Sequence, residues 1–265
     1  MSEVPPAAAD YRFRDRAVYL TSTETLVLAD LHIGRDGASE VSASLEPTDD
    51  LVGRLTTLLA FFEPGRVVFA GDLLHQFSRV SDAARETVDT LRAACLDAGA
   101  DPVAVAGNHD TRLADCWPTA VHDSVMLDDE TVVCHGHEEP AASGMRYIIG
   151  HDHPAITIEG VRRPCFLFGE ATYRGGDLLV LPAFTRLAGG VEVNNRRSDE
   201  FQSPLVTDLG SLRPVVADAA DADPTDVDAA ARGSRDDAAD AGGTMATSFA
   251  DPLWFPPLAS FRRLL

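Results

Sequence analysis

The sequence contains no lysine, although it carries 22 basic residues against 42 acidic ones. Every basic residue is therefore an arginine, and the formal net charge is −20. The Debye length falls to ~3 Å at about 1 M salt, so repulsion between acidic side chains is screened there. We interpret this composition as a halophilic adaptation; an acidic protein of an ordinary, low-salt cell is the alternative.

Net charge is a poor guide to binding partners under these conditions. At low salt a charge of −20 would argue against nucleic acid, but in molar salt the release of counterions contributes little driving force. Adjacent arginines are expected to be solvated surface pairs rather than phosphate contacts: Arg162-Arg163, Arg196-Arg197 and Arg262-Arg263.

The sequence also lacks closely spaced cysteines and long apolar runs. Its cysteines, Cys95, Cys116, Cys134 and Cys165, form no C-x-x-C pair. They are expected to be small buried hydrophobic residues in a reducing cytoplasm, rather than disulfides or zinc ligands. No stretch approaches a membrane span, and the polar first 16 residues lack the apolar region of a signal peptide. We expect a soluble, cytoplasmic protein without a membrane partner.

Strand-like and helix-like patterns alternate over the first 110 residues. The predicted strands cover 18–20, 25–29, 67–70 and 103–106, and the predicted helices open at Pro47 and at Ser81-Asp82 and end before Pro64 and Gly99. Each strand is followed by a polar motif. Because ligands bind at the carboxyl ends of strands in an open α/β sheet, these motifs are expected to share one edge.

After residue 120 the pattern changes to short strand-like runs at 121–127, 131–134, 147–149, 155–158, 164–168 and 178–181. They predict a second, largely antiparallel sheet that packs on the first. The predicted fold class is α/β, a four-layer α/β/β/α sandwich of two mixed sheets flanked by helices.

The domain organisation predicted from composition has three parts. Residues 1–216 form the folded domain, and residues 217–243 form an acidic, low-complexity flexible insertion, because alanine and aspartate cannot bury enough apolar surface. The apolar residues of 244–265 are expected to dock on the core; a tail that binds a partner is the alternative.

Five short segments hold the residues that point to chemistry. They supply carboxylates, an amide and imidazoles: Asp30-Leu31-His32, Gly71-Asp72, Gly107-Asn108-His109-Asp110, His135-Gly136-His137 and Gly150-His151-Asp152-His153. The first two are weak alone, since Gly-Asp is a common turn and a surface acid can lie near a histidine by chance. The run 107–110 is stronger, because four small or polar residues directly after an apolar strand have no packing rationale, and each histidine pair alone suits a metal site and a core position about equally. Together they suit Mn²⁺, Fe²⁺ or Zn²⁺, and they suffice for two ions that share a carboxylate.

This order of motifs resembles the calcineurin-like metallophosphoesterase superfamily, over about residues 17–184. Residues 71–75 and 150–155 resemble its SbcD-related archaeal branch, close to the bacterial ligase-associated DNA-repair phosphoesterases. The resemblance implies a metallophosphoesterase sandwich with two divalent cations. Mn²⁺ is the expected metal, with Fe²⁺ or Zn²⁺ as alternatives.

The resemblance also assigns roles to the motif residues. It implies one metal on Asp30, His32 and His153, a second on Asn108, His135 and His151, and Asp72 as the bridge. His109 would be a catalytic non-ligand beside the leaving-group oxygen, oriented by Asp110. The remaining motif residues would lie behind the ligands: His75, His137 and Asp152.

The implied enzyme is a metal-dependent phosphoesterase of the phosphodiesterase or nuclease type. It would hydrolyse phosphodiester bonds of nucleic acid or nucleotides by attack of a metal-bridging hydroxide, with DNA or a nucleotide as its partner. Hydrolysis of a small phosphomonoester or a cyclic nucleotide is the alternative within this class. A non-catalytic metal-binding scaffold is the alternative outside it. The sequence is silent on protein partners and on oligomeric state.

Overall fold

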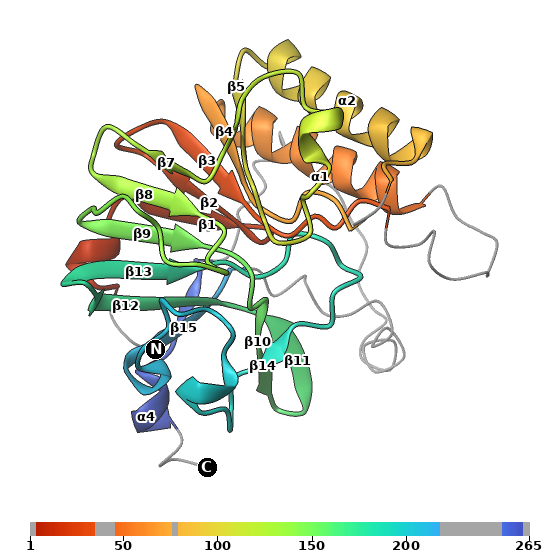
Figure 1. The fold of residues 1–265 in the computed structure, drawn as a ribbon. Coiled ribbons are helices and arrows are strands. Elements are labelled where there is room, and N and C mark those ends of the chain that lie inside the picture. The colour runs from red at the N-terminus through yellow and green to blue at the C-terminus, as the bar shows by residue number, and fades with distance from the viewer. Residues whose placement is uncertain (1–3, 35–45, 76–78, 218–250, 262–265) are drawn as a thin grey trace, which may run out of the picture.

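Two mixed sheets pack face to face in the computed structural model, which describes residues 4–34, 46–75, 79–217 and 251–261 (Figure 1). The first sheet has the strand order β1 (Tyr11–Arg14), β2 (Ala17–Leu20), β3 (Thr25–Leu28), β4 (Arg66–Ala70), β5 (Asp101–Val105) and β6 (Val121–His122). The antiparallel β2–β3 hairpin and the parallel pairing of β3, β4 and β5 confirm the predicted open α/β half.

The second sheet has seven strands. In spatial order they are β16 (Leu253–Trp254), β15 (Arg213–Val216), β12 (Phe166–Tyr173), β13 (Gly176–Val180), β9 (Arg146–Ile149), β8 (Thr131–Cys134) and β7 (Ser124–Met126). Most of its pairings are antiparallel, but β9 runs parallel to both β8 and β13. A small third sheet consists of β11 (Val161–Pro164), β10 (Pro154–Ile158) and β14 (Val191–Glu192).

Helices α1 (Glu46–Phe62) and α2 (Asp82–Asp97) cover the outer face of the first sheet (Figure 1). Leu55 and Leu58 of α1 and Val88 and Leu91 of α2 are buried against Phe69 of β4. The predicted cap is confirmed, since the Ser81 hydroxyl accepts a hydrogen bond from the backbone N–H of Ala84. The regularly spaced apolar residues of both helices therefore mark the helix face that packs on the sheet.

A continuous apolar core joins the inner faces of the two sheets. Val27 and Val68 of the first sheet meet Phe166, Phe168 and Leu179 of the second, all of them buried. Burying one such side chain contributes about 1.5–3 kcal/mol, so this core strongly opposes separation of the sheets.

The outer face of the second sheet has a different cover. Tyr147 and Leu178 are buried there against Leu205, Leu209 and Leu258. Most of this layer is irregular chain, with the short helices η4 (Ser198–Glu200), η5 (Leu209–Ser211) and α4 (Leu258–Phe261); two more 3-10 turns, η1 (Pro6–Ala8) and η3 (Leu113–Asp115), lie elsewhere. The four-layer sandwich is thus built with two long helices on one side and short turns on the other.

Within the predicted tail, residues 251–261 are described. Strand β16 pairs with β15, and Trp254 is buried in the core between the sheets. The predicted acidic insertion, beyond Ala217, and residues 244–250 lie outside the described residues.

Two predicted strands are each divided between sheets. The apolar run 121–127 forms β6 in the first sheet and β7 in the second. The run 164–168 ends β11 of the small sheet and begins β12. An apolar run reports burial but not the point where the chain crosses from one sheet to another, so the prediction of single strands was wrong in both places.

All four cysteines are buried and free, as predicted. Cys134 packs in the core on the outer side of the second sheet, away from the neighbouring His135. No helix among the described residues has the length and apolar character needed to cross a membrane.

Candidate metal centre

The loops beyond β3, β4 and β5 lie side by side at the carboxyl ends of these strands. The backbone N–H of Asp30 donates to the carbonyl of Gly71 (3.0 Å), and that of His32 donates to the carbonyl of Asp72 (2.9 Å). The Asp110 carboxylate accepts hydrogen bonds from the backbone of the β4 loop. These bonds fix three polar motifs of the first sheet against one another.

Asp30, His32 and His153 form one compact group of side chains. His153 Nε2 lies 3.0 Å from Asp30 Oδ1 and 3.3 Å from His32 Nε2. Asp30 and His32 follow β3, whereas His153 precedes β10. Their ligand atoms lie close enough to one another to surround a single metal ion.

A second group brings together Asn108, His135 and His151. His135 Nε2 lies 3.2 Å from Asn108 Oδ1 and 3.2 Å from His151 Nδ1. His135 follows β8 and His151 follows β9, both in the second sheet. These are the residues that the resemblance assigns to the second metal.

The Asp72 carboxylate lies between the two groups. Its Oδ1 is 3.5 Å from His135 Nε2, and its Oδ2 is 4.0 Å from His32 Nε2. The side chain is almost fully buried. One carboxylate thus presents an oxygen to each group, the arrangement that a bridging ligand requires.

Electrostatics in this cluster favour a bound cation. Burial lowers the pKa of His32 and of His151 to about 4, so both rings are neutral and able to act as ligands. Burial opposes the charge of Asp72, but its contact with His135 keeps the Asp72 pKa below the ordinary value. Burial likewise opposes the protonation of His135, yet the carboxylates of Asp72 and Asp30 raise its pKa to about 9. The two carboxylates therefore attract positive charge, which a divalent cation would supply.

The backbone at these positions adopts an unusual conformation. Positive φ angles in the left-handed region occur at five of the predicted ligands: Asp30 (59°), His32 (49°), Asp72 (50°), His151 (73°) and His153 (48°). Such a conformation costs a non-glycine residue about 1–3 kcal/mol, and it clusters at functional sites, where the surrounding structure enforces it. Hydrogen bonding of the loops here maintains this strain.

Glycines of two motifs make room for ligands of other motifs. A Cβ on Gly107 would lie 2.1 Å from Asp72 Oδ1, and a Cβ on Gly150 would lie 2.5 Å from Asp30 Oδ2. Both distances are shorter than any van der Waals contact. The glycines that precede Asn108 and His151 are therefore needed for the close approach of the β4 and β3 loops.

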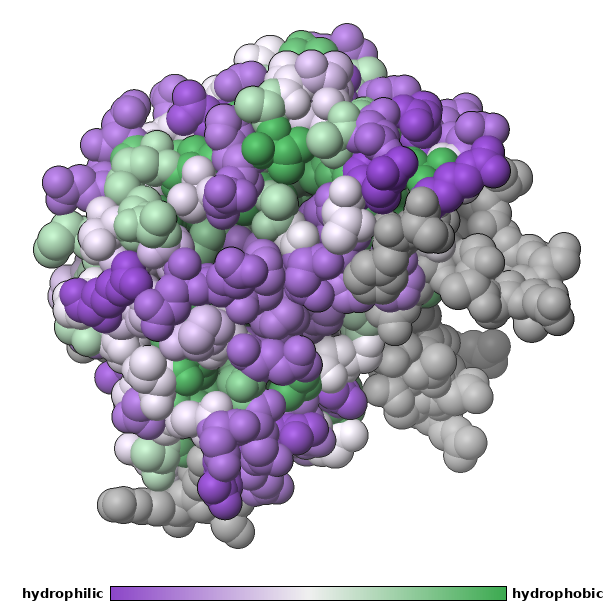
Figure 2. Space-filling view, viewed as in Figure 1, coloured by the Kyte–Doolittle hydropathy of each residue, from purple (hydrophilic) through white to green (hydrophobic). Residues whose placement is uncertain are grey.

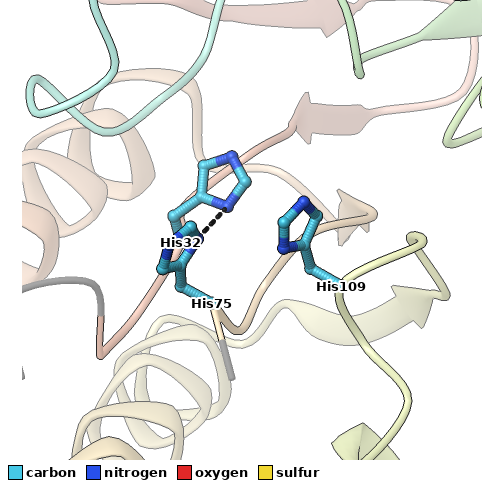
Figure 3. Close-up of side chains that lie close together, drawn as sticks. All are labelled: His32, His75 and His109. Carbon is cyan, nitrogen blue, oxygen red and sulfur yellow. Dashed lines mark hydrogen bonds between the residues drawn. The ribbon is translucent and has the colours of Figure 1, made fainter. Parts of the chain in front are cut away.

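His109 lies at the rim of this cluster, next to His75 (Figure 3). Its backbone N–H donates to Asp72 Oδ1 (2.9 Å), and its Nε2 lies 3.9 Å from Asp72 Oδ2. The His75 ring stacks on the His109 ring with centroids 5.2 Å apart and an interplanar angle of 13°. His75 Nδ1 is also 3.4 Å from His32 Nδ1, so His75 contacts both a predicted ligand and the predicted acid.

Asp110 holds backbone rather than a ring in this structure. Its carboxylate accepts hydrogen bonds from the N–H groups of Leu73 (3.1 Å), Leu74 (2.8 Å) and Gly107 (2.9 Å). Burial raises the pKa of Asp110 to about 6. Asp110 therefore joins the β4 loop to the β5 loop. That Asp110 also orients His109 stays a prediction.

Two further predicted residues lie at the border of the centre. The Asp152 carboxylate accepts hydrogen bonds from the N–H groups of Gln202 (2.8 Å) and Ser203 (3.1 Å), which anchors the loop that carries His151 and His153. The half-buried His137 ring lies 5.2 Å from the His135 ring. Both positions suit residues that support ligands.

Three arginines near the centre were absent from the predicted site. Arg16, Arg162 and Arg186 line a pocket that also borders His153. Arg162 belongs to a pair that the sequence placed at the solvent. Arg162 lies on β11, the strand that follows β10, and β10 begins directly after His153. This nearness in the sequence could have suggested that Arg162 lies close to the centre.

The residues of the two groups fit a pair of divalent cations. The donors are carboxylate, amide and imidazole groups without thiolate, which suits hard or borderline ions. Each close pair of histidine nitrogens, at 3.2 Å and 3.3 Å, joins a ring whose pKa burial lowers, His151 or His32, to a ring whose pKa neighbouring carboxylates raise against the effect of burial, His135 or His153.

No family model and no curated protein matches this sequence. Among solved structures, the nuclease MPE from Pseudomonas putida is similar, with 25% sequence identity and a TM-score of 0.56 over 76% of this chain and 88% of that chain. A phosphoesterase from E. coli, Yfce, has 18% identity and a TM-score of 0.40 over 63% of this chain and 83% of that chain. The chain has the metallophosphoesterase sandwich fold that its motifs predict.

Proposed function

We propose that this chain is a metal-dependent phosphoesterase that hydrolyses phosphodiester bonds of nucleic acid or nucleotides. The position of Asp72 carries the proposal, because its two oxygens face two separate groups of ligands. The similar Pseudomonas putida structure is a nuclease, which supports the choice of substrate class.

The proposed ligands are Asp30, His32 and His153 for one cation, Asn108, His135 and His151 for the other, and Asp72 for both. Two divalent cations bound here would lower the pKa of a coordinated water and stabilise negative charge on the phosphoryl oxygens. The protein contributes a rigid arrangement of neutral and charged donors. The negative charge of this arrangement lies on the buried carboxylates of Asp30 and Asp72.

His109 is the proposed general acid. Its ring is 24% exposed and stands at the rim, 3.9 Å from Asp72 Oδ2, where a leaving group can reach it. Its backbone bond to Asp72 and its stack on His75 limit its movement. Protonation of the departing alkoxide by a positioned histidine is worth ~10²–10⁴-fold in rate.

A substrate panel tests the reaction class. We expect hydrolysis of bis-p-nitrophenyl phosphate and of single-stranded DNA in molar potassium chloride with Mn²⁺, and no hydrolysis after metal removal with EDTA. p-Nitrophenyl phosphate is the monoester control. Faster hydrolysis of the monoester would identify the alternative, a phosphomonoesterase. Inactivity on every substrate, in a protein that retains no transition metal, would contradict the proposal.

His109→Ala separates the proposed acid from the ligands. We expect a rate about 10²–10⁴-fold lower on substrates with a poor leaving group, with metal content unchanged by elemental analysis. The control is His122→Ala, which removes an exposed histidine of β6. Full activity of His109→Ala would remove His109 from the mechanism.

Several finer assignments belong to the same proposal. We propose Mn²⁺ as the metal, with Fe²⁺ or Zn²⁺ as alternatives. We also propose that the chain is related to the SbcD-related archaeal branch of the superfamily and that it comes from a halophilic organism. The absence of lysine and the charge of −20 support the halophilic origin. Free, buried cysteines support a cytoplasmic location. The folded domain is proposed to span 1–216, with 217–243 as an acidic insertion and 244–265 as a docking tail.

A further inference from the structure

A pocket of about 430 Å³ opens beside the metal centre. His153, a proposed ligand, forms part of its wall, so the pocket borders a residue of the proposed site of reaction. The remaining wall comes from Arg16 in the turn between β1 and β2, from β10 and β11, and from the loop that follows β13. Figure 2 shows a band of hydrophilic residues across this face, between the helices and the small sheet of β10, β11 and β14.

The charged residues of this pocket are arginines. Arg16, Arg162 and Arg186 line it, and among the described residues no aspartate or glutamate does. This composition is unusual in a chain with 42 acidic residues against 22 arginines. A positive pocket on so acidic a protein is a place where an anion is favoured over other ligands.

Arg16 forms a rigid part of the wall. It is 9% exposed, and its Nη1 donates to the backbone carbonyls of Ala183 (3.3 Å) and Thr185 (2.8 Å). Thr185 N–H in turn donates to the carbonyl of Asp30 (3.2 Å). The guanidinium is therefore fixed relative to the backbone of a metal ligand.

The other two arginines are closer to solvent. Arg162 donates to the carbonyl of Gly190 across the pocket. Arg186 Nη1 lies 3.1 Å from Asp50, and its side chain is 45% exposed. Asp50 also lies 3.2 Å from Arg54, so its charge is shared between two arginines. Both side chains are exposed, so a ligand that enters the pocket can reach them.

The size and chemistry of the pocket match a nucleotide. Pockets of about 300–1,000 Å³ bind small organic ligands, and the planar guanidinium group binds phosphate oxygens in pairs. Pro154, Pro164 and Leu187 add apolar surface for a sugar or a base. A substrate with one isolated phosphate would leave this pocket unused.

We propose that the pocket binds the nucleotide next to the scissile bond, with Arg162 and Arg186 contacting its phosphate and Arg16 shaping the wall. The substrate class is then an oligonucleotide rather than a small phosphodiester. This inference rests on the proposed function, because it places the scissile phosphate at the metal centre.

The test compares three substrates in molar potassium chloride with Mn²⁺. Bis-p-nitrophenyl phosphate has one phosphate and no nucleoside, thymidine 5′-p-nitrophenyl phosphate adds a nucleoside, and a thymidine pentanucleotide adds neighbouring phosphates. The variants are Arg162→Gln and Arg186→Gln. Arg163→Gln is the matched control, because it removes the same charge from the next residue of β11, on the opposite face of the strand.

We expect each pocket variant to lower the ratio of kcat/KM for the pentanucleotide to kcat/KM for bis-p-nitrophenyl phosphate about tenfold, the effect of losing one hydrogen bond to a charged group. Arg163→Gln should keep the wild-type ratio. An unchanged ratio in both pocket variants would overturn the inference, as would an equal loss in the control. An equal loss with thymidine 5′-p-nitrophenyl phosphate would show recognition of the nucleoside and overturn the phosphate contact. Inactivity of the wild-type enzyme on all three substrates would instead contradict the proposed function itself.

Discussion

The two sheets contribute different chemistry to the proposed metal centre. The loops of the first sheet supply oxygen donors and one histidine, at Asp30, His32, Asp72 and Asn108, whereas the strand ends of the second supply only imidazoles, at His135 and His151. The loop that enters β10 adds His153. Each proposed metal site takes residues from both parts of the chain. Neither sheet could form the centre alone, so the centre depends on the packing between them.

The two sheets also hold their donors differently. The loops of the first sheet are bound to one another by backbone hydrogen bonds at Asp30 and His32. His135 of the second sheet contacts the first directly, because its Nδ1 lies 3.2 Å from the carbonyl of Ala70 in β4. The oxygen donors are therefore fixed within one sheet, and the imidazoles are fixed by the contact between sheets.

Asp72→Asn is expected to have the largest effect, because Asp72 faces the donors of both sheets. Loss of a residue that supports a metal ligand lowers metal affinity by up to about 100-fold. Loss of the Asp72 charge should lower metal affinity by more than that, and activity should fall together with metal affinity. Elemental analysis and hydrolysis rates measure both effects. Asp101→Asn, at an exposed position of β5, is the control. Two retained metal equivalents in Asp72→Asn would contradict the bridging role.

Phe168→Ala tests the contact between the sheets. Phe168 is fully buried in the core that joins them, and its truncation should destabilise the protein by about 3–5 kcal/mol. We also expect weaker metal binding, measured by titration of the folded protein. Leu91→Ala, in the core between α2 and the first sheet, is the comparison: it should cost about 2–5 kcal/mol and leave metal affinity near the wild-type value. Equal metal affinities in the two variants would show that the centre tolerates loosening of this interface.

Gly107→Ala should have a smaller effect, confined to the first sheet. The added methyl group would lie 2.1 Å from Asp72 Oδ1, so the β5 loop must shift and carry Asn108 with it. We expect lower activity and metal affinity with a modest loss of stability by thermal unfolding. Gly53→Ala in α1, where a Cβ meets no atom within 4 Å, should stabilise the protein by up to about 1 kcal/mol. Wild-type metal affinity in Gly107→Ala would show that the close approach is not required.

Much of the first sheet could be predicted from local sequence. The hairpin before Asp30, the Ser81 cap and the buried strands before Asp72 and Asn108 each follow from short-range patterns. Strands 121–127 and 164–168 could not be placed, since burial looks the same in either sheet. The layer outside the second sheet was also hidden, because irregular chain such as 201–209 has no periodicity.

The sequence by itself determined the donor chemistry, since residue type decides which ions a side chain can bind, and it indicated that the donors follow strands. Only the tertiary structure decided the rest: that Asp72 lies between the two groups, that Gly107 and Gly150 leave room for carboxylates of other loops, and that three arginines line a pocket which His153 also lines. Such contacts join residues far apart in the chain, and they depend on how two sheets pack rather than on any local pattern.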